Sequence, residues 1–281
     1  MPLSNKPADP RCALLVIDMQ YDFMPGGQLA VADGDTLLPL INRLGARFAR
    51  VIITQDWHPA GHISFASSHA QRLPFESINL PYGAQTLWPD HCVQGSRGAQ
   101  LHAELDLPHA QLILRKGCNA HIDSYSAFLE ADRTTSTGLA GYLKERGIDT
   151  VFVVGLALDF CVAWSAQDAR SAGFNTYVIE DGCRAIDMNG SLEHAWKPCW
   201  AWASSAYKVP ICWARPAYLP TGTNILRCAR QLANDGARHL SETSDRHCPC
   251  RPIPSLALRM LYGPRSRRQD PRPLRRGRAR D

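Results

Sequence analysis

Residues 12–18 read CALLVID, a run of six apolar residues that ends at an acidic one. A short apolar run without polar alternation is typical of a strand buried on both faces of a parallel sheet. Similar runs predict further strands at residues 51–54, 111–114, 150–154 and 175–179. Apolar residues at helical spacing predict the intervening helices at residues 36–50, 139–146 and 162–172. This alternation predicts an α/β fold with three layers, α-β-α, around a central parallel sheet.

Reactive side chains follow four of these predicted strands. Asp18 comes after the first strand, Asp56 after the second, Lys116 after the third and Cys161 after the fourth. Ligands of such sheets bind beyond the carboxyl ends of the strands. We therefore expect these four side chains to meet on one rim.

Cys161 lies in GLALDFCV, between a predicted strand and a predicted helix. Free N–H groups at a helix N-terminus stabilise a thiolate and can hold an oxyanion. Taken singly, each of these residues has a more ordinary interpretation. A cysteine is more often a small buried hydrophobic residue. Asp18 is more often a loop carboxylate or a helix cap, and Lys116 is more often a surface charge. Taken together, the carboxylate can accept the thiol proton while the ammonium stabilises both negative groups.

Six segments of the chain resemble the nicotinamidase/pyrazinamidase branch of the isochorismatase-like hydrolases, from about Cys12 to Lys197. They read IDMQYDFMPGGQLAV, TQDWHPAGHISFAS, LWPDHCVQG, RKGC, DSYSAF and VVGLALDFCVAWSAQDA. The resemblance implies a catalytic triad of Asp18, Lys116 and Cys161 and acyl transfer through a thioester. It also implies a cis peptide bond between Leu156 and Ala157, with the backbone N–H groups of Ala157 and Cys161 as the oxyanion hole.

A metal signature accompanies the triad. Asp56 and His58 are two residues apart, so that in an extended segment they point the same way. With His91 they provide a carboxylate and two imidazoles, which suit Zn²⁺, Fe²⁺ or Mn²⁺. An isolated D-x-H triplet is usually an ordinary polar loop, but the resemblance implies one divalent metal ion on these three residues, with His62 as a further candidate ligand. That metal would hold a pyridine nitrogen.

Two aromatic residues, Phe23 and Trp88, resemble the pair that sandwiches the substrate ring in this family. Without the resemblance both would be interpreted as core residues. Tyr21 departs from the family, whose members commonly carry Asn there, and this change could alter metal-water or substrate contacts.

The resemblance implies a nicotinamidase that releases nicotinic acid and ammonia in NAD salvage and also accepts pyrazinamide. Another amidohydrolase of the same fold, of the ureidoacrylate or carbamoyl-sarcosine type, would keep the triad but generally lack the metal triplet. The sequence has no apolar run of about 18 residues and no signal peptide. We therefore expect a cytoplasmic enzyme with no membrane partner, a small amide substrate, and a monomeric or homo-oligomeric state.

The charge of the chain divides at about Lys197. Residues 198–281 hold 16 Lys+Arg and 5 Asp+Glu, whereas residues 1–197 hold 15 and 21. A basic tail can bind nucleic acid, but these charges are neither ordered on a helix face nor interleaved with aromatics. We therefore expect no nucleic-acid partner.

The tail also leaves the family pattern. After NGSLEHAWK the family normally continues with one helix and one strand, approximately AMLGMGVKRIQSxDLL, where this chain has PCWAWASSAYKVPICW. Restoring one G before the codon of Pro198 makes the codons compatible with the family ending. Our hypothesis is a single-base frameshift, which gives a catalytic domain at residues 1–197 and a disordered, non-family tail at 198–281. The C-terminal helix and strand of the fold would then be lost, and an inactive product is the alternative outcome.

Overall fold

A central parallel sheet organises the domain in the computed structural model, which describes residues 9–195 and 212–213. Its strand order is β5-β2-β1-β6-β7-β8, and every neighbouring pair is parallel. The strands are β1 Cys12–Ile17, β2 Val51–Asp56, β5 Leu112–Lys116, β6 Thr150–Leu156, β7 Asn175–Arg184 and β8 Cys212–Trp213. Because β1 and β6 lie at the centre, their residues are almost entirely buried.

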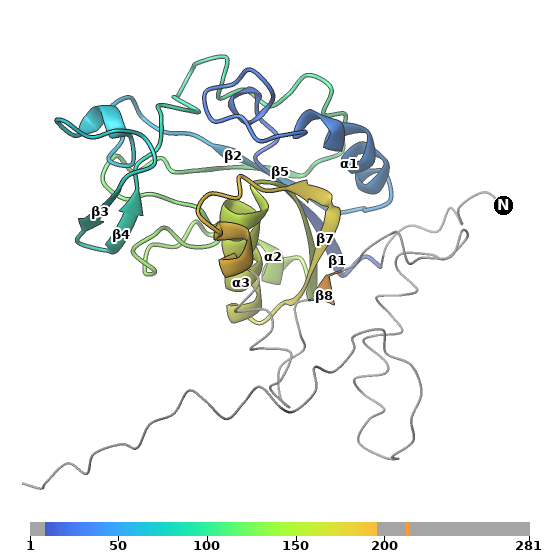
Figure 1. The fold of residues 1–281 in the computed structure, drawn as a ribbon. Helices are drawn as coiled ribbons and strands as arrows, with labels where there is room; N and C mark the ends of the chain where they lie inside the picture. Colours follow the sequence, from blue (N-terminus) through green and yellow to red (C-terminus); the bar gives the residue numbers. More distant parts are fainter. Residues whose placement is uncertain (1–8, 196–211, 214–281) are drawn as a thin grey trace, which may run out of the picture. The chain divides into compact units, whose positions relative to one another are not determined.

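Helices cover both faces of this sheet (Figure 1). Alternate residues of β1 belong to different apolar clusters, since a strand points successive side chains to opposite faces. Leu14 packs in the cluster that contains the buried side of α1, Leu38–Gly45. Leu15 packs in the cluster that contains α2, Leu139–Glu145, and α3, Ala163–Ser171. The predicted three-layer α-β-α architecture is confirmed.

Short elements differ from the sequence prediction in two places. The predicted helix at residues 36–50 begins as the 3₁₀ turn η2, Asp35–Leu37, and its α-helical part ends at Gly45. An antiparallel hairpin of β3, Ser77–Leu80, and β4, Gly83–Thr86, was not predicted and forms a separate two-stranded sheet. Three further short turns are described: η1 Tyr21–Phe23, η3 Ala66–Ser68 and the π-helical η4 Leu158–Val162.

The sheet extends beyond the predicted domain boundary at Lys197. Cys212–Trp213 forms β8 and pairs in parallel with Tyr177 and Val178 of β7. The expectation that the final strand is lost is therefore wrong for these two residues. An unpaired strand edge offers N–H and C=O groups that another extended segment can satisfy. The expected loss of the last helix and the expected disorder of the rest of the tail lie outside the described residues.

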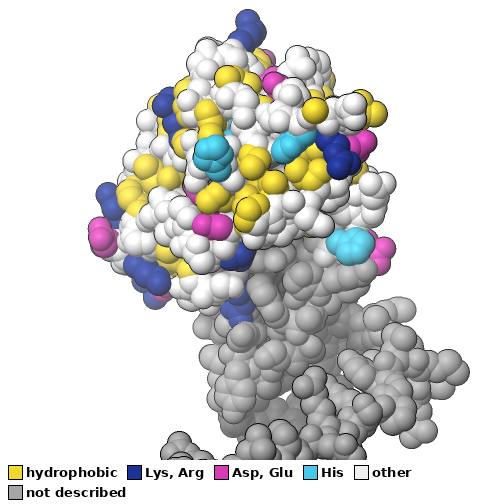
Figure 2. Space-filling view, turned by 90° about the vertical axis from the view of Figure 1, so that its left-hand side faces the viewer, with side chains coloured by type: hydrophobic (Ala, Val, Ile, Leu, Met, Phe, Trp, Pro, Cys, Tyr) yellow, Lys and Arg dark blue, Asp and Glu magenta, His cyan; other side chains and the backbone are white. Residues whose placement is uncertain are grey.

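The outer surface of the described domain is of mixed character. On the face in Figure 2, Lys and Arg, Asp and Glu, and hydrophobic side chains are interspersed. In the described part of the chain, no helix has the length and apolar character that a membrane span requires.

Candidate active site at the carboxyl rim of the sheet

Lys116 lies at the centre of the predicted rim. Its Nζ is 2.9 Å from Asp18 Oδ2, 3.1 Å from Asp56 Oδ1 and 3.4 Å from Cys161 Sγ. Asp18 follows β1, and Cys161 lies in η4 just after β6. Asp56 and Lys116 are the last residues of β2 and β5 and pair with each other in register, rather than following their strands as predicted. The parallel strands thus bring these four side chains to one point.

Burial and the Lys116 charge set the ionisation of this cluster. Burial alone would lower the pKa of Lys116, but the Asp18 and Asp56 carboxylates raise it well above its ordinary value. Burial raises the pKa of Asp18, although the Lys116 ammonium opposes this. Burial likewise raises the pKa of the Cys161 thiol well above its ordinary value, again against Lys116. The resting site therefore holds a charged lysine, a thiol and an unusually basic carboxyl group.

The Asp18 carboxylate is fixed on one side and open on the other. Thr54 Oγ1 donates a 2.6 Å hydrogen bond to Asp18 Oδ1 and accepts one of 3.1 Å from the Asp18 backbone N–H. Asp18 Oδ2 has the ion pair with Lys116, but no aligned hydrogen-bond donor among the described residues. This oxygen is therefore suited to accept a proton.

The loop that carries Cys161 has the backbone that the family resemblance implied. The peptide bond between Leu156 and Ala157 is cis, so this expectation is confirmed. The buried Asp159 carboxylate, within the same loop, accepts hydrogen bonds from the backbone N–H groups of Ile186 at 3.0 Å and Asp187 at 2.8 Å. These bonds fix the Cys161 loop against the segment that follows β7.

Asp56, His58 and His91 form a compact group of donors. Their ligand atoms lie within 4.8 Å of one another, and all three residues are buried. Asp56 Oδ2 is 3.0 Å from His58 Nε2 and 3.5 Å from His91 Nε2. His58 Nδ1 lies 3.0 Å from Gly117 O and His91 Nδ1 lies 2.8 Å from Pro89 O.

Those carbonyl contacts favour a tautomer that carries the ring proton on Nδ1 of each histidine. In that tautomer the Nε2 atoms of His58 and His91 carry no hydrogen and face an Asp56 carboxylate oxygen, so that three electron-pair donors converge. A carboxylate and two neutral imidazoles are a donor set for a divalent cation, and the three residues fit such an ion.

His62 lies beside this group. It belongs to a second cluster with His58 and Asp123, whose ligand atoms also lie within 4.8 Å of one another. Its Nδ1 is 2.7 Å from Ser64 Oγ and its Nε2 is 2.9 Å from Asn119 O. Burial lowers the pKa of His62 to about 4, so the ring is neutral. Both ring nitrogens are thus already engaged.

One cavity joins the predicted residues. Seven of them line it: Phe23, Asp56, His58, Trp88, His91, Ala157 and Cys161. Asp18 and Lys116 are not among the lining residues and are almost fully buried next to Cys161. The Trp88 indole is held edge-on to Phe160, with ring centroids 4.9 Å apart, and donates a 3.0 Å hydrogen bond to Tyr125 Oη.

Sequence reasoning assigned no role to five other residues of this cavity, Leu29, Asp123, Tyr125, Phe160 and Ile186. Asp123 and Tyr125 belong to DSYSAF, a quoted segment whose polar side chains were the available signal. Ile186 gave no signal, because it comes from a loop far from the other motifs in sequence. Tyr21 does not line this cavity; it lines another one.

Comparison with known proteins gives a consistent picture. Residues 12–198 match the model of the Isochorismatase domain family. A nicotinamidase of Acinetobacter baylyi is 67% identical over 186 residues, which are 66% of this chain and 87% of that protein.

Solved structures with the same fold agree with this match. The structure of a nicotinamidase pyrazinamidase from Acinetobacter baumannii is 57% identical, with a TM-score of 0.70, over 74% of this chain and 97% of that one. A zinc-bound pyrazinamidase of Pyrococcus horikoshii is 30% identical, with a TM-score of 0.58, over 73% and 99% of the two chains. The family match spans more than half of the chain, and this chain belongs to the isochorismatase domain family.

Proposed function

We propose that the chain is a nicotinamidase, an amidohydrolase that converts nicotinamide to nicotinic acid and ammonia and also accepts pyrazinamide. The observation that carries this proposal is the single cavity that unites a buried nucleophile, a metal-type donor set and two aromatic walls. The nicotinamidase and pyrazinamidase relatives support the same substrates. The small substrate, a cytoplasmic location, and a monomeric or homo-oligomeric state are part of the proposal.

In the proposed reaction, Cys161 is the nucleophile and Asp18 the proton carrier. Asp18 Oδ2 accepts the thiol proton as sulfur attacks the carboxamide carbon. The proton then passes from Asp18 to the departing nitrogen, so that ammonia leaves and a thioester remains. A water molecule next gives its proton to Asp18 and attacks the thioester, which releases the acid and restores the thiol. The Lys116 ammonium, 3.4 Å from the sulfur, stabilises the negative charge throughout.

We assign the oxyanion hole to the backbone N–H groups of Ala157 and Cys161. Both residues line the cavity, and the tetrahedral oxygen of the substrate would receive two fixed donors there. Such donors need no reorganisation as charge develops, which is why a rigid loop is well suited to this role.

Substrate orientation is assigned to the opposite part of the cavity. Asp56, His58 and His91 would hold a divalent ion, Zn²⁺, Fe²⁺ or Mn²⁺, which when bound supplies a Lewis-acid contact for the ring nitrogen. The relative solved in complex with zinc supports a divalent metal in this chain. Phe23 and Trp88 would flank the flat ring and exclude water from it.

The decisive experiment measures ammonia release from nicotinamide by the full chain and by Cys161→Ala. We expect the variant to lose roughly 10³-fold or more in kcat/KM. Cys118→Ala is the matched control, since Cys118 is exposed and outside the cavity. Nicotinamide turnover retained by Cys161→Ala would disprove the mechanism.

Metal analysis separates this function from the other amidohydrolases of the fold. We expect about one divalent ion per chain in the active protein, and loss of the ion and of turnover in His91→Ala. A fully active protein without bound metal would favour an amidohydrolase of another substrate class.

A further inference from the structure

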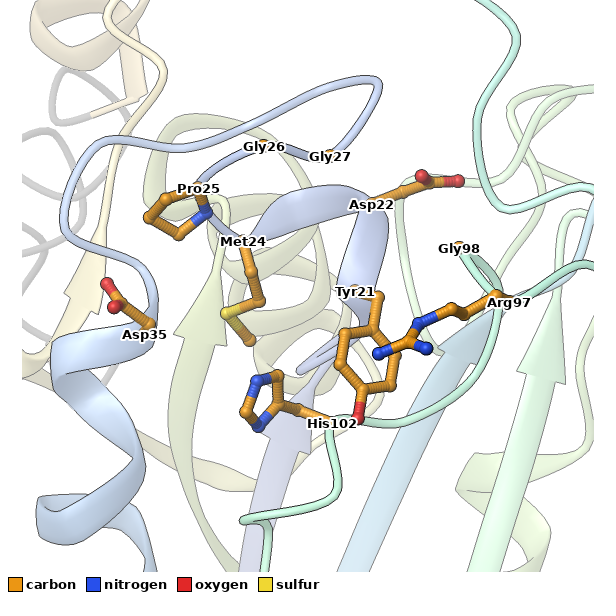
Figure 3. A pocket seen from close by; sticks show the side chains of 10 residues that line it. All are labelled: Tyr21, Asp22, Met24, Pro25, Gly26, Gly27, Asp35, Arg97, Gly98 and His102. Carbon is orange, nitrogen blue, oxygen red and sulfur yellow. The ribbon is translucent and has the colours of Figure 1, made fainter.

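A second cavity lies beside the catalytic one. It measures about 400 Å³, within the range of small-molecule sites, roughly 300–1,000 Å³. Its lining includes Tyr21, Met24, Asp35, Arg97 and His102 (Figure 3), and no lining residue is shared with the catalytic cavity. The reaction proposed above makes no use of it.

Apart from Asp35, the lining residues come from two segments, residues 21–27 and 97–102, that backbone hydrogen bonds join. The bonds are Tyr21 N–H to Gln100 O at 3.1 Å, Asp22 N–H to Gly98 O at 3.0 Å and His102 N–H to Met19 O at 2.8 Å. The packing is close: a Cβ on Gly98 would lie 2.0 Å from Asp22 Oδ2. The cavity is therefore formed before any ligand arrives, which lowers the entropic cost of binding.

One cation of the cavity lacks an acidic partner. The Arg97 guanidinium lies over the Tyr21 ring, 4.8 Å from its centroid. No carboxylate among residues 9–195 and 212–213 forms an ion pair with it. Asp22, a buried acid that also lines the cavity, instead accepts backbone N–H bonds from Cys92 at 2.7 Å and Gln28 at 3.3 Å. Arg97 is thus available to an anionic ligand group.

The rest of the lining limits what that ligand can be. The rings of Tyr21 and His102, 4.7 Å between centroids, and the buried side chain of Met24 offer surface to a flat apolar group. Figure 3 shows Asp35 on the side of the cavity opposite Arg97. A second negative group would be repelled there, so polyphosphates are disfavoured.

We infer that this cavity binds a small aromatic monocarboxylate, with its carboxylate on Arg97 and its ring against Tyr21, His102 and Met24. A guanidinium and a carboxylate match in geometry and can form two parallel hydrogen bonds. Tyr21 and Phe23 lie in the same short turn, η1, so the ligand would contact the element that also supplies one wall of the catalytic cavity.

The test is equilibrium titration of the full chain with benzoate, which carries the ring and carboxylate without a pyridine nitrogen. We expect Arg97→Gln to weaken this binding roughly tenfold or more. Arg43→Gln, a change at an exposed arginine of α1 outside both cavities, should leave it unchanged. Tyr21→Leu keeps the guanidinium but removes the ring, and it should also weaken binding. Benzoate binding in the catalytic cavity would be the same in all of these variants. A difference in affinity between them therefore reports on the second cavity alone.

Three results would overturn the inference. They are no benzoate binding by the unmodified chain in the millimolar range, equal binding by Arg97→Gln, or equally tight binding of benzyl alcohol, which has the ring but no charge. Because the titration requires no turnover, its outcome is independent of whether the chain deamidates nicotinamide.

Discussion

At the scale of single residues, Lys116 contacts both groups to which we assign the reaction, Asp18 and Cys161, and one proposed metal ligand, Asp56. Its ammonium reaches two carboxylates, the Cys161 sulfur and, at 3.0 Å, the carbonyl oxygen of Ser124. All of these partners are buried, so each negative charge depends on the lysine for compensation. We therefore expect Lys116 to support both the fold and the proposed reaction.

Lys116→Met should therefore lower both the stability of the fold and the turnover of nicotinamide. It leaves Asp18 and Asp56 buried without their cation, and we expect the free energy of unfolding to fall by about 3–5 kcal/mol. Nicotinamide turnover should also fall, because the negative charge of the reaction loses its partner. Lys144→Met, at an exposed site, is the control and should change stability by about 0.5 kcal/mol or less. Equal unfolding curves for the two variants would contradict this.

The pH profile tests Asp18 without removing it. Asp18 accepts a proton only when ionised, so kcat/KM should fall as pH decreases through its raised pKa. The hydrogen bond from Thr54 lowers that pKa, so Thr54→Val should raise it and shift the acidic limb to higher pH. Thr176→Val, another buried threonine, should leave the limb in place. If the acidic limb of the kcat/KM profile is unchanged in Thr54→Val, or moves to lower pH, Asp18 is not the base.

The position of a side chain was easiest to predict from the sequence where the residue ends or follows a strand. The parallel register of β2 and β5 places Asp56 beside Lys116, so knowing the strands is nearly enough to locate both. Ile186 and Phe160 escaped prediction, since an apolar residue has the same appearance in sequence whether it lines a cavity or fills a core.

At the scale of elements, β6 and the loop after it determine where Cys161 lies. Gly155 has a φ of +116°, and a Cβ on it would lie 2.1 Å from the Ile17 backbone oxygen of β1. At the same point the register between β6 and β7 shifts. Only glycine allows β6 to turn so close to its neighbour.

Gly155→Ala should therefore destabilise the fold, by about 2–4 kcal/mol from combined backbone strain and overpacking. Gly141→Ala is a matched glycine substitution with the opposite expectation. It lies in α2 with no atom near its added Cβ, and alanine should stabilise the helix by up to about 1 kcal/mol. Thermal melts of both variants measure the difference, and a shift of the same sign in both would exclude this explanation.

Elements with a strong apolar pattern were predictable and those without it were not. The strands β1, β2 and β6 are mostly apolar, and both of their faces are buried. The β3–β4 hairpin was missed because its strands are short and half exposed, so they carry little hydrophobic signal. Helix α1 was predicted too long, since apolar spacing continues through Phe48 after the helical backbone has ended at Gly45.

At the scale of the whole molecule, the sequence pattern predicts the end of the sheet least well. β7 has ten residues, but the two-residue β8 pairs with only two of them, Tyr177 and Val178. The family match ends at residue 198, just where the composition changes. We propose that a single-base frameshift near Lys197 replaced the natural C-terminal sequence with an unselected one.

This proposal predicts that a frame-restored chain is more stable than the chain as written. We expect the helix and strand of the family ending to bury more apolar side chains and to pair with more of β7 than the two residues that β8 pairs with. We expect a Tm higher by at least about 5 °C, since each kcal/mol is worth roughly 2–4 °C in a domain of this size. A third chain that stops at Lys197 separates the two causes. If losing the basic tail were the benefit, this chain would gain as much, whereas we expect it to gain nothing. Equal melting of all three chains, together with a reproducible reading of the present frame at the locus, would show that the ending is genuine.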